Sequence, residues 1–228
     1  QPEYESLVRY FDVVVLLHQK QYDYVIDLQG LLKSALIVSS ALGARKIGLS
    51  ASREGARLFY KEVAGKKNKT RHAAEELMDV ARHLNLPVAE PLNFPITFPK
   101  RKSLGKGLHI ALCPRSRAAG KDWPIDRFAL VAIALRKTHN ATIHLVGSPD
   151  DQALCEAMTV AIGNDGVINH AGKTSLIELG SLLQVVDMLI TVDSGPMHMA
   201  AAIGTPTLAL FGPTSPLRTG PYGKQHRV

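Results

Sequence analysis

The chain has 228 residues, 46% of them hydrophobic, and its 27 Lys and Arg against 20 Asp and Glu give a formal charge of +7. This length and apolar content suffice for a buried core in one large or two small domains, and no apolar run reaches the roughly 18 residues of a membrane span. The positive charge favours an anionic partner: nucleic acid, nucleotide phosphates or an anionic membrane surface. Aromatic residues make up only 6% and do not interleave with basic stretches, so we expect no nucleic-acid partner.

The first 86 residues predict an α/β domain, because helical and strand-like apolar patterns alternate there. The expected elements are a helix over 5–19, with Asp12 as the place where it would divide, a strand over 23–30, a helix over 31–43, a strand over 45–50 and a long helix over 70–86. Prolines then recur over residues 87–107, where neither a helix nor a central strand would continue. We interpret 87–107 as a linker.

Residues 108–228 predict a second α/β domain of doubly wound, Rossmann-like type. Strands are expected over 108–114, 141–147, 166–172, 187–193 and 205–212, and helices over 126–139, 150–163, 174–186 and 194–204. Thr174 is the expected N-cap of the third of these helices, with Glu178 in its early turns. Two such halves would enclose a ligand cleft at the carboxyl ends of their strands.

Asp193, Ser194, Gly195, Pro196 and His198 stand where the strand over 187–193 meets the next helix. Neither a glycine-rich dinucleotide motif nor a P-loop is present, but any helix N-terminus offers unpaired N–H groups to an anion. A glycine there allows close approach of a ligand, and a proline in the first turn loses no hydrogen bond. The alternative is an ordinary helix capped by Ser194 or Asp193.

A hydrolytic triad and a metal centre are both disfavoured at this junction. Ser194 and His198 are four residues apart and could share a helix face, but the nucleophile motif GxSxG is absent and Asp193 adjoins the serine. No third ligand accompanies Asp193 and His198. Cys113 and Cys155 lack metal-ligand spacing and are typical of reduced thiols in the cytoplasm.

Two further polar loops follow strands of the second domain. Ser116, Arg117 and Lys121 lie after the first strand and provide a hydroxyl and two cations for phosphate oxygens, although solvated loop charges would look the same. Asp151 lies after the second strand, where it would cap the following helix or accept hydrogen bonds from ribose hydroxyls. Trp123 is expected to be a packing anchor. Three such loops at one sheet edge favour a nucleotide site.

Several motifs occur together in an order that resembles the family 9 glycosyltransferases, the lipopolysaccharide heptosyltransferases. They are PRSRAAGKDWP at 114–124, GSPDD at 147–151, HAGKTSLIEL at 170–179 and DSGPMHMAAAIGTPTLALFGPTSPLRTGPYG at 193–223. DLQGLLKSAL at 27–36, SREGARLFY at 52–60 and RHAAEEL at 71–77 look most like the branch that adds the first inner-core heptose, heptosyltransferase I.

The resemblance implies a GT-B architecture, in which two Rossmann-like domains face each other across a cleft. It also implies a metal-independent transferase without a cofactor, which moves heptose from ADP-heptose to a lipid A–Kdo acceptor and inverts the anomeric centre. The implied donor-binding residues are Ser116, Arg117, Lys121, Asp151, Asp193, Ser194, Gly195 and His198. The implied acceptor-side residues are Asp27, Gln29, Gly30, Lys33, Arg53, Glu54 and His72. The net charge would suit an acidic acceptor at the inner face of the cytoplasmic membrane.

The family pattern KxSxxGDxxxxxP, whose Asp is the favoured catalytic base, is absent from this sequence. We therefore expect a chain truncated at both ends, with an incomplete N-terminal domain of residues 1–86, a linker of 87–107 and a donor domain of 108–228. The catalytic residue is left unassigned. The alternatives are a GT-B transferase with another nucleotide sugar and a non-catalytic nucleotide-sugar-binding remnant.

Overall fold

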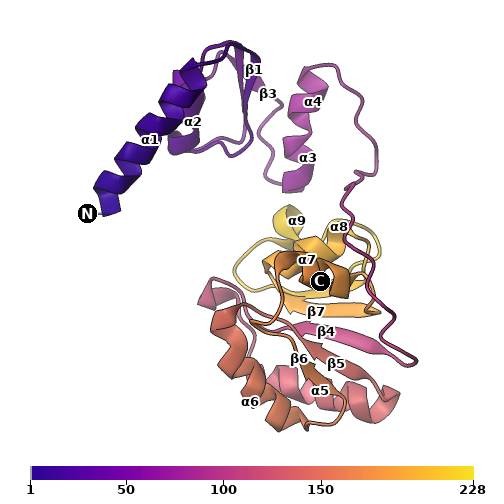
Figure 1. Cartoon of the computed structure of the whole chain (residues 1–228). Helices are drawn as coiled ribbons and strands as arrows, with labels where there is room; N and C mark the ends of the chain where they lie inside the picture. The colour runs from indigo at the N-terminus through magenta and orange to yellow at the C-terminus, as the bar shows by residue number, and fades with distance from the viewer. Residues whose placement is uncertain (1) are drawn as a thin grey trace. The chain divides into compact units, whose positions relative to one another are not determined.

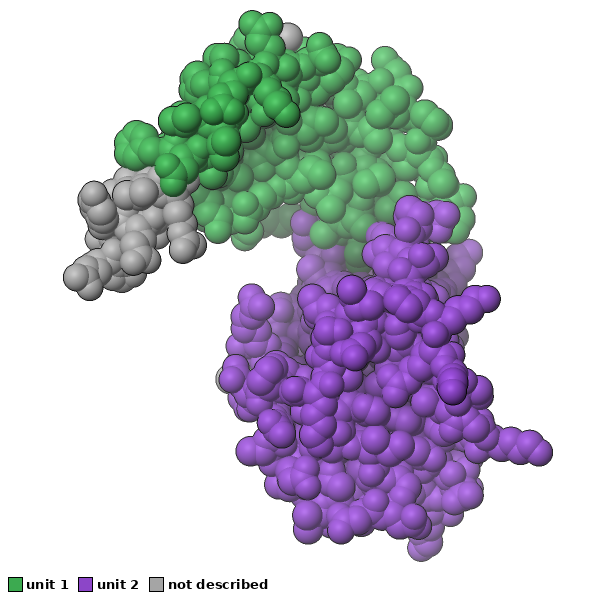
Figure 2. Space-filling view, viewed as in Figure 1, with its two compact units in different colours: residues 1–92 green, residues 93–228 purple. Residues whose placement is uncertain are grey.

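The computed structural model describes residues 2–228, except the side chains of residues 2–9, 44 and 119. The chain forms two compact units, residues 1–92 and 93–228 (Figures 1 and 2). The boundary falls inside the proline-rich segment, and residues 86–108 contain neither helix nor strand. Over residues 2–228, no helix combines the length and the apolar character that a membrane span needs.

Unit 2 contains a five-stranded, wholly parallel sheet with the order β6-β5-β4-β7-β8. The strands are β4 (His109–Cys113), β5 (Thr142–Leu145), β6 (Val167–Asn169), β7 (Met188–Val192) and β8 (Thr207–Leu210). The chain builds outward from β4 to one side and then crosses to β7 on the other. In such sheets the crevice for a ligand lies at this switch point, at the carboxyl ends of the strands.

Helices cover both faces of this sheet (Figure 1). Ile110 and Leu112 of β4 face α5 (Ile125–His139) and α6 (Gln152–Ile162), whereas Ala111 and Cys113 face α7 (Leu176–Leu183) and α8 (Gly195–Ala202). Because β4 is buried on both sides, it reads as a continuous apolar run. The remaining short elements of unit 2 are η2 (Ala119–Lys121), η3 (Pro149–Asp151) and α9 (Pro216–Thr219).

Unit 1 contains a three-stranded parallel sheet in the order β1-β2-β3. Its elements are α1 (Pro2–His18), β1 (Tyr22–Asp27), α2 (Leu32–Ser40), β2 (Gly43–Leu49), η1 (Ala56–Phe59), β3 (Glu62–Ala64), α3 (Ala73–Leu77) and α4 (Asp79–His83). Ala35 and Val38 of α2 pack with Ala56 and Tyr60, whereas Val80 of α4 belongs to a second apolar cluster. The strand β3 was not predicted, because three residues carry too little periodicity.

Three local predictions were wrong. The helix α1 runs through Asp12 without dividing. The long helix expected over 70–86 is instead two short helices separated at Met78. The cap of α7 is Ser175, not Thr174: Ser175 has an extended backbone, its hydroxyl accepts from the Glu178 N–H, and the Glu178 carboxylate accepts in return from the Ser175 N–H.

The proline-rich segment is attached to α7 of unit 2. The Phe98 N–H donates to the Gln184 side chain at 3.1 Å, and the Gln184 amide donates to the Phe98 carbonyl at 3.3 Å. The Phe98 ring lies against Gly180, where a Cβ would come within 2.4 Å of the ring. Gly180 therefore allows this part of the segment to pack closely on the helix.

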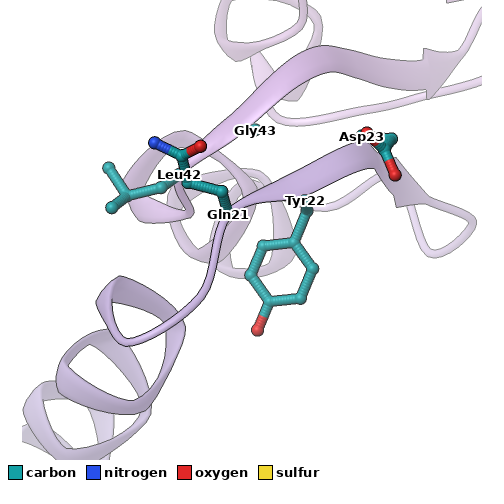
Figure 3. Close-up of a pocket in the computed structure, with 5 residues that line it drawn as sticks. All are labelled: Gln21, Tyr22, Asp23, Leu42 and Gly43. Atoms are coloured by element: carbon teal, nitrogen blue, oxygen red, sulfur yellow. The ribbon is translucent and has the colours of Figure 1, made fainter.

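A hollow of about 410 Å³ in unit 1 is lined by Gln21, Tyr22, Asp23, Leu42 and Gly43 (Figure 3). These residues stand at the amino ends of β1 and β2. The predicted acceptor-side residues begin at Asp27, where β1 ends. The hollow therefore lies at the sheet edge opposite the predicted site.

Three histidines of unit 2 form a hydrogen-bonded chain across β4, β5 and the end of β6. His109 Nδ1 lies 3.1 Å from His144 Nε2, and His144 Nδ1 lies 3.0 Å from His170 Nε2. Burial lowers the pKa of His144 to about 4, and the neighbouring His170, His109 and Arg101 act in the same direction. The His170 pKa is also lowered, first by burial and then by Arg101 and Lys173. The folded chain therefore favours the neutral imidazoles of His144 and His170.

We expect this histidine chain to make unit 2 less stable in mild acid. Unfolded His144 takes up a proton near pH 6.5, but folded His144 does so only near pH 4. The stabilisation is therefore complete above about pH 6.5 and lost as the pH falls towards 4, by about 3 kcal/mol. In urea unfolding followed by the fluorescence of Trp123, His144→Gln should reduce this pH dependence. The exposed control His139→Gln should retain it; an equal slope in both variants would contradict the assignment.

The apolar side chains packed between α5 and the sheet are expected to stabilise unit 2. Phe128 is fully buried, and its ring contacts Trp123 edge-to-face with centroids 5.0 Å apart; Trp123 is thus the packing anchor that the sequence predicted. Phe128→Ala should lower the free energy of unfolding by about 3–5 kcal/mol, measured by circular dichroism in urea. Leu130, on the same helix but 63% exposed, is the matched control, and Leu130→Ala should change stability by less than about 0.5 kcal/mol. Equal losses would show that α5 packs differently.

Candidate functional site

Polar loops gather at the carboxyl edge of the unit 2 sheet, as the sequence predicted for parallel strands. The loop over 114–124 follows β4, the loop over 147–151 follows β5, residues 193–195 follow β7, and residues 211–215 follow β8. Since β4 and β7 are neighbours across the switch point, their loops meet directly.

Asp193 is the centre of this edge. Its Oδ2 accepts hydrogen bonds from Lys121 Nζ and Thr214 Oγ1, both at 2.7 Å, and the side chain is 6% exposed. Burial opposes ionisation of Asp193, but the bonds from Lys121 and Thr214 and the nearby charges of Lys121 and His198 together lower its pKa. One buried carboxylate therefore joins the loops that follow β4, β7 and β8.

Ser194 is not arranged as a nucleophile. Its hydroxyl lies 2.9 Å from Thr191 Oγ1 and donates weakly to Cys113 Sγ at 3.8 Å. Its backbone is extended, so it precedes α8 and does not share a helix face with His198. Burial raises the pKa of Cys113 to about 11, which makes this thiol unreactive. These contacts support the exclusion of a hydrolytic triad.

The N-terminus of α8 opens towards the same edge. Ser194 occupies the N-cap position, but its side chain makes no capping hydrogen bond, and Pro196 lies in the first turn. The reading of an ordinary Ser-capped helix is therefore wrong. A Cβ on Gly195 would meet no atom within 4 Å, so the approach to the first turn is open. The exposed His198 follows in that turn. This geometry suits an anion.

The loop over 114–124 is held by its own hydrogen bonds. The Ser116 N–H donates to Asp122 Oδ1 at 2.8 Å, and the Ser116 hydroxyl donates to the Ala118 carbonyl at 2.7 Å. Arg115 Nε lies 3.5 Å from Asp122 Oδ2 and 3.8 Å from Asp151 Oδ1, which joins this loop to the one after β5. Arg117 is exposed on the loop.

The Asp151 side chain makes its hydrogen bonds within the turn that contains it. Its Oδ2 accepts from the Ser148 N–H at 2.9 Å and from the Ser148 hydroxyl at 2.7 Å. These bonds make Asp151 the N3 partner of Ser148 in a capping box of η3. At the N-cap of the following helix α6, the Asp151 side chain makes no capping hydrogen bond, so the predicted cap of that helix is not formed. A contact with ribose remains a prediction. Among the side chains that the structure describes, no three of His, Cys, Asp or Glu are grouped to hold a metal ion.

Asp27 ends β1 and organises the predicted acceptor side in unit 1. Its Oδ1 accepts from the Gln29 and Gly30 N–H groups at 2.8 and 2.9 Å, and its Oδ2 accepts from Ser34 and Tyr60 hydroxyls, each at 2.7 Å. Burial opposes its ionisation, but these bonds outweigh that effect and lower the pKa of Asp27. The Tyr60 hydroxyl is correspondingly harder to ionise, since burial and the bond to Asp27 raise its pKa above the ordinary value.

The structure brings most other predicted acceptor-side residues to the loop around Asp27. Gly30 has φ 66°, and its carbonyl accepts from the Arg53 N–H at 2.8 Å. Glu54 accepts from the Leu32 N–H at 3.2 Å, which caps α2 beside the exposed Lys33. His72 caps α3, since its side chain accepts from the Ala74 N–H at 3.1 Å.

Sequence reasoning missed five residues that hold these loops in place. They are Ser34, Tyr60, Arg115, Asp122 and Thr214. All five lie within motifs that pointed to the site, but nothing in the spacing indicated their partners. Thr214 is 21 residues from Asp193, and Tyr60 is 33 residues from Asp27.

Comparisons with known proteins identify the family of this chain. The family model for glycosyltransferase family 9 (heptosyltransferase) matches residues 13–228, and the chain belongs to this family. The chain is 31% identical to the lipopolysaccharide core heptosyltransferase OpsX of Haemophilus influenzae, and the match covers 93% of this chain and 63% of OpsX. It is also 31% identical to lipopolysaccharide heptosyltransferase 1 of Salmonella typhimurium, over 90% of this chain and 65% of the relative.

Among solved structures, E. coli heptosyltransferase WaaC with ADP superposes with a TM-score of 0.77 at 26% identity, over 96% of this chain and 70% of that one. This likeness confirms the α/β, GT-B type of fold, with a parallel sheet in each unit. The cleft between the two domains stays a prediction. The chain spans less than two thirds of the length of the curated relatives OpsX and heptosyltransferase 1.

The contacts of Asp193 predict the effect of removing Thr214. Thr214→Val takes one donor from a buried carboxylate and should lower the free energy of unfolding by about 1–3 kcal/mol at neutral pH. Because the folded pKa of Asp193 is lowered, its stabilisation is present above the ordinary Asp pKa and lost in acid, so the deficit of the variant should shrink as the pH falls.

Urea unfolding at neutral and acidic pH measures this difference. Thr138→Val is the matched control, because the Thr138 hydroxyl donates only to the Ala134 carbonyl on the surface of α5. If Thr214→Val were as stable as Thr138→Val, the hydrogen bond from Thr214 to Asp193 would not contribute to stability, which would contradict the prediction.

Proposed function

We propose that this chain is a lipopolysaccharide core heptosyltransferase that uses ADP-heptose as donor and the Kdo region of lipid A–Kdo as acceptor. The observation that carries the proposal is the Lys121–Asp193–Thr214 cluster beside the open N-terminus of α8, in a chain of glycosyltransferase family 9. The presence of ADP in the solved WaaC structure, and of ADP-2-deoxy-2-fluoro heptose in another, supports the choice of donor.

The transfer requires attack of an acceptor hydroxyl on the anomeric carbon as the bond to the diphosphate oxygen breaks. In a single in-line step the anomeric configuration inverts, the sugar moves to the acceptor oxygen and ADP leaves. Negative charge then grows on the β-phosphate. The Lys121 ammonium and the N–H groups of the first turn of α8 are placed to stabilise that charge, so the proposal needs no metal ion.

Asp193 and Asp27 serve positioning roles in this proposal. A general base works best when its pKa is near the working pH. The pKa values of both carboxyl groups are lowered instead, and both accept several hydrogen bonds. The base that takes the proton of the acceptor is therefore assigned to neither residue.

The acceptor side is assigned to the loops around Asp27 in unit 1. The exposed cations Lys33 and Arg53 suit an acceptor that carries carboxylates and phosphates. Such an acceptor is anchored in a membrane, so the proposal includes work at the inner face of the cytoplasmic membrane. No nucleic acid and no cofactor enter it.

The donor assignment predicts how the chain binds nucleotides. In isothermal titration, ADP and ADP-heptose should bind and UDP should bind more weakly, and chelation of divalent cations by EDTA should change the affinity less than about twofold. Lys121→Ala should weaken ADP binding by about 1–3 kcal/mol, the range for a hydrogen bond to a charged group. Unchanged affinity would remove Lys121 from the site.

The control is Lys137→Ala, which removes a cation from α5 and should leave ADP binding as it was. Because Asp193 loses a partner in Lys121→Ala, the urea unfolding midpoint of this variant is measured as well, to check that unit 2 remains folded. Preference for UDP would favour a transferase with another nucleotide sugar. ADP-heptose binding without transfer to a Kdo-containing acceptor would favour a binding remnant.

A further inference from the structure

The carboxyl edge of the unit 1 sheet combines exposed leucines with cations. Because β1, β2 and β3 are parallel, the loops that follow them lie at one edge. Between residues 53 and 71 the sequence holds seven Lys and Arg against two Glu. Leu58 is 88% exposed, the largest exposed fraction among the large apolar side chains that the structure describes.

We name the Leu58 patch by its six residues. They are Leu28, Leu32, Lys33, Arg53, Arg57 and Leu58, all of which are exposed. Two hydrogen bonds join its two segments, from the Arg53 N–H to the Gly30 carbonyl and from the Leu32 N–H to the Glu54 carboxylate. Leu58 is carried by η1, which is fixed from beneath by the buried Ala56 and Tyr60. The patch is therefore a built surface.

The acidic residues near the patch are engaged locally. Glu54 accepts from the Leu32 N–H at the start of α2. Glu62 accepts from Arg45 and lies 2.8 Å from His83 Nε2. The cations Lys33, Arg53 and Arg57 outnumber the carboxylates of Glu54 and the buried Asp27, so the field over the Leu58 patch is positive.

We propose that the Leu58 patch docks the chain on an anionic bilayer surface. Leucine side chains gain free energy by entering the boundary between head groups and acyl chains, while neighbouring Lys and Arg attract anionic lipids. A nucleic acid would match the cations but would leave the leucines without an apolar partner. Docking by this edge would bring the loop around Asp27 to a lipid-linked acceptor. The inference rests on the proposed function, to which it adds the membrane-binding surface, and binding of vesicles can be tested without a donor.

Flotation of the whole chain with vesicles tests the proposal. The chain should bind vesicles of phosphatidylcholine mixed with phosphatidylglycerol, bind phosphatidylcholine alone at least about fivefold more weakly, and detach as salt rises. Leu58→Glu should weaken binding to the anionic vesicles by about tenfold or more, and Arg57→Gln by about fivefold. Leu130→Glu adds the same charge to an exposed leucine of unit 2 and should stay within about twofold of the parent chain.

Equal binding to both kinds of vesicle, equal losses for Leu58→Glu and Leu130→Glu, or failure to bind the anionic vesicles would each overturn the proposal. A fluorescent oligonucleotide that binds the chain and is lost with Arg57→Gln but not with Leu58→Glu would overturn it in favour of nucleic acid. ADP titration of the same samples separates this result from the donor assignment. Intact ADP binding without vesicle binding would overturn only the proposed docking surface and would leave the donor assignment standing.

Discussion

The carboxylate of Asp193 is the constraint on which the polar loops of unit 2 depend. A buried carboxylate without partners would be costly, and here Lys121 and Thr214 offset that cost from two other loops. The same bonds that keep Asp193 charged therefore fix the loops after β4, β7 and β8 relative to one another. The Ser194 hydroxyl adds to this order by its contacts with Thr191 and Cys113.

Unit 1 uses the same device. Asp27 ends β1 as Asp193 follows β7, and its two oxygens accept two backbone N–H groups and two hydroxyls. In each case an ionised aspartate at the carboxyl end of a parallel strand holds a loop of the predicted site in place by accepting hydrogen bonds. The two units thus share a sheet type and also a way of ordering the loops at its edge.

Much of this arrangement could be predicted from the sequence, because apolar runs and amphipathic stretches alternate clearly after residue 108. Parallel strands then require that Lys121, Asp151 and Asp193 share one sheet edge. What could not be predicted is which polar atom meets which, since the partners of Asp193 and Asp27 come from distant parts of the chain. The break at Met78 and the shift of the α7 cap to Ser175 are decided by local hydrogen bonds that periodicity does not report.

The pairing of Lys121 with Asp193 also bears on how a diphosphate would be held. An ammonium group has three N–H donors, and the bond to Asp193 uses one, so Lys121 can bind phosphate without leaving its partner. Their charges largely cancel, however, so the long-range attraction for the diphosphate must come from other groups. In the proposed function, cations such as the exposed Arg117 would provide this attraction, and the first-turn N–H groups of α8 would act at short range. In the same proposal Lys121 would act at short range, where the bond to the leaving oxygen breaks, and its hydrogen bond to Asp193 would hold it there.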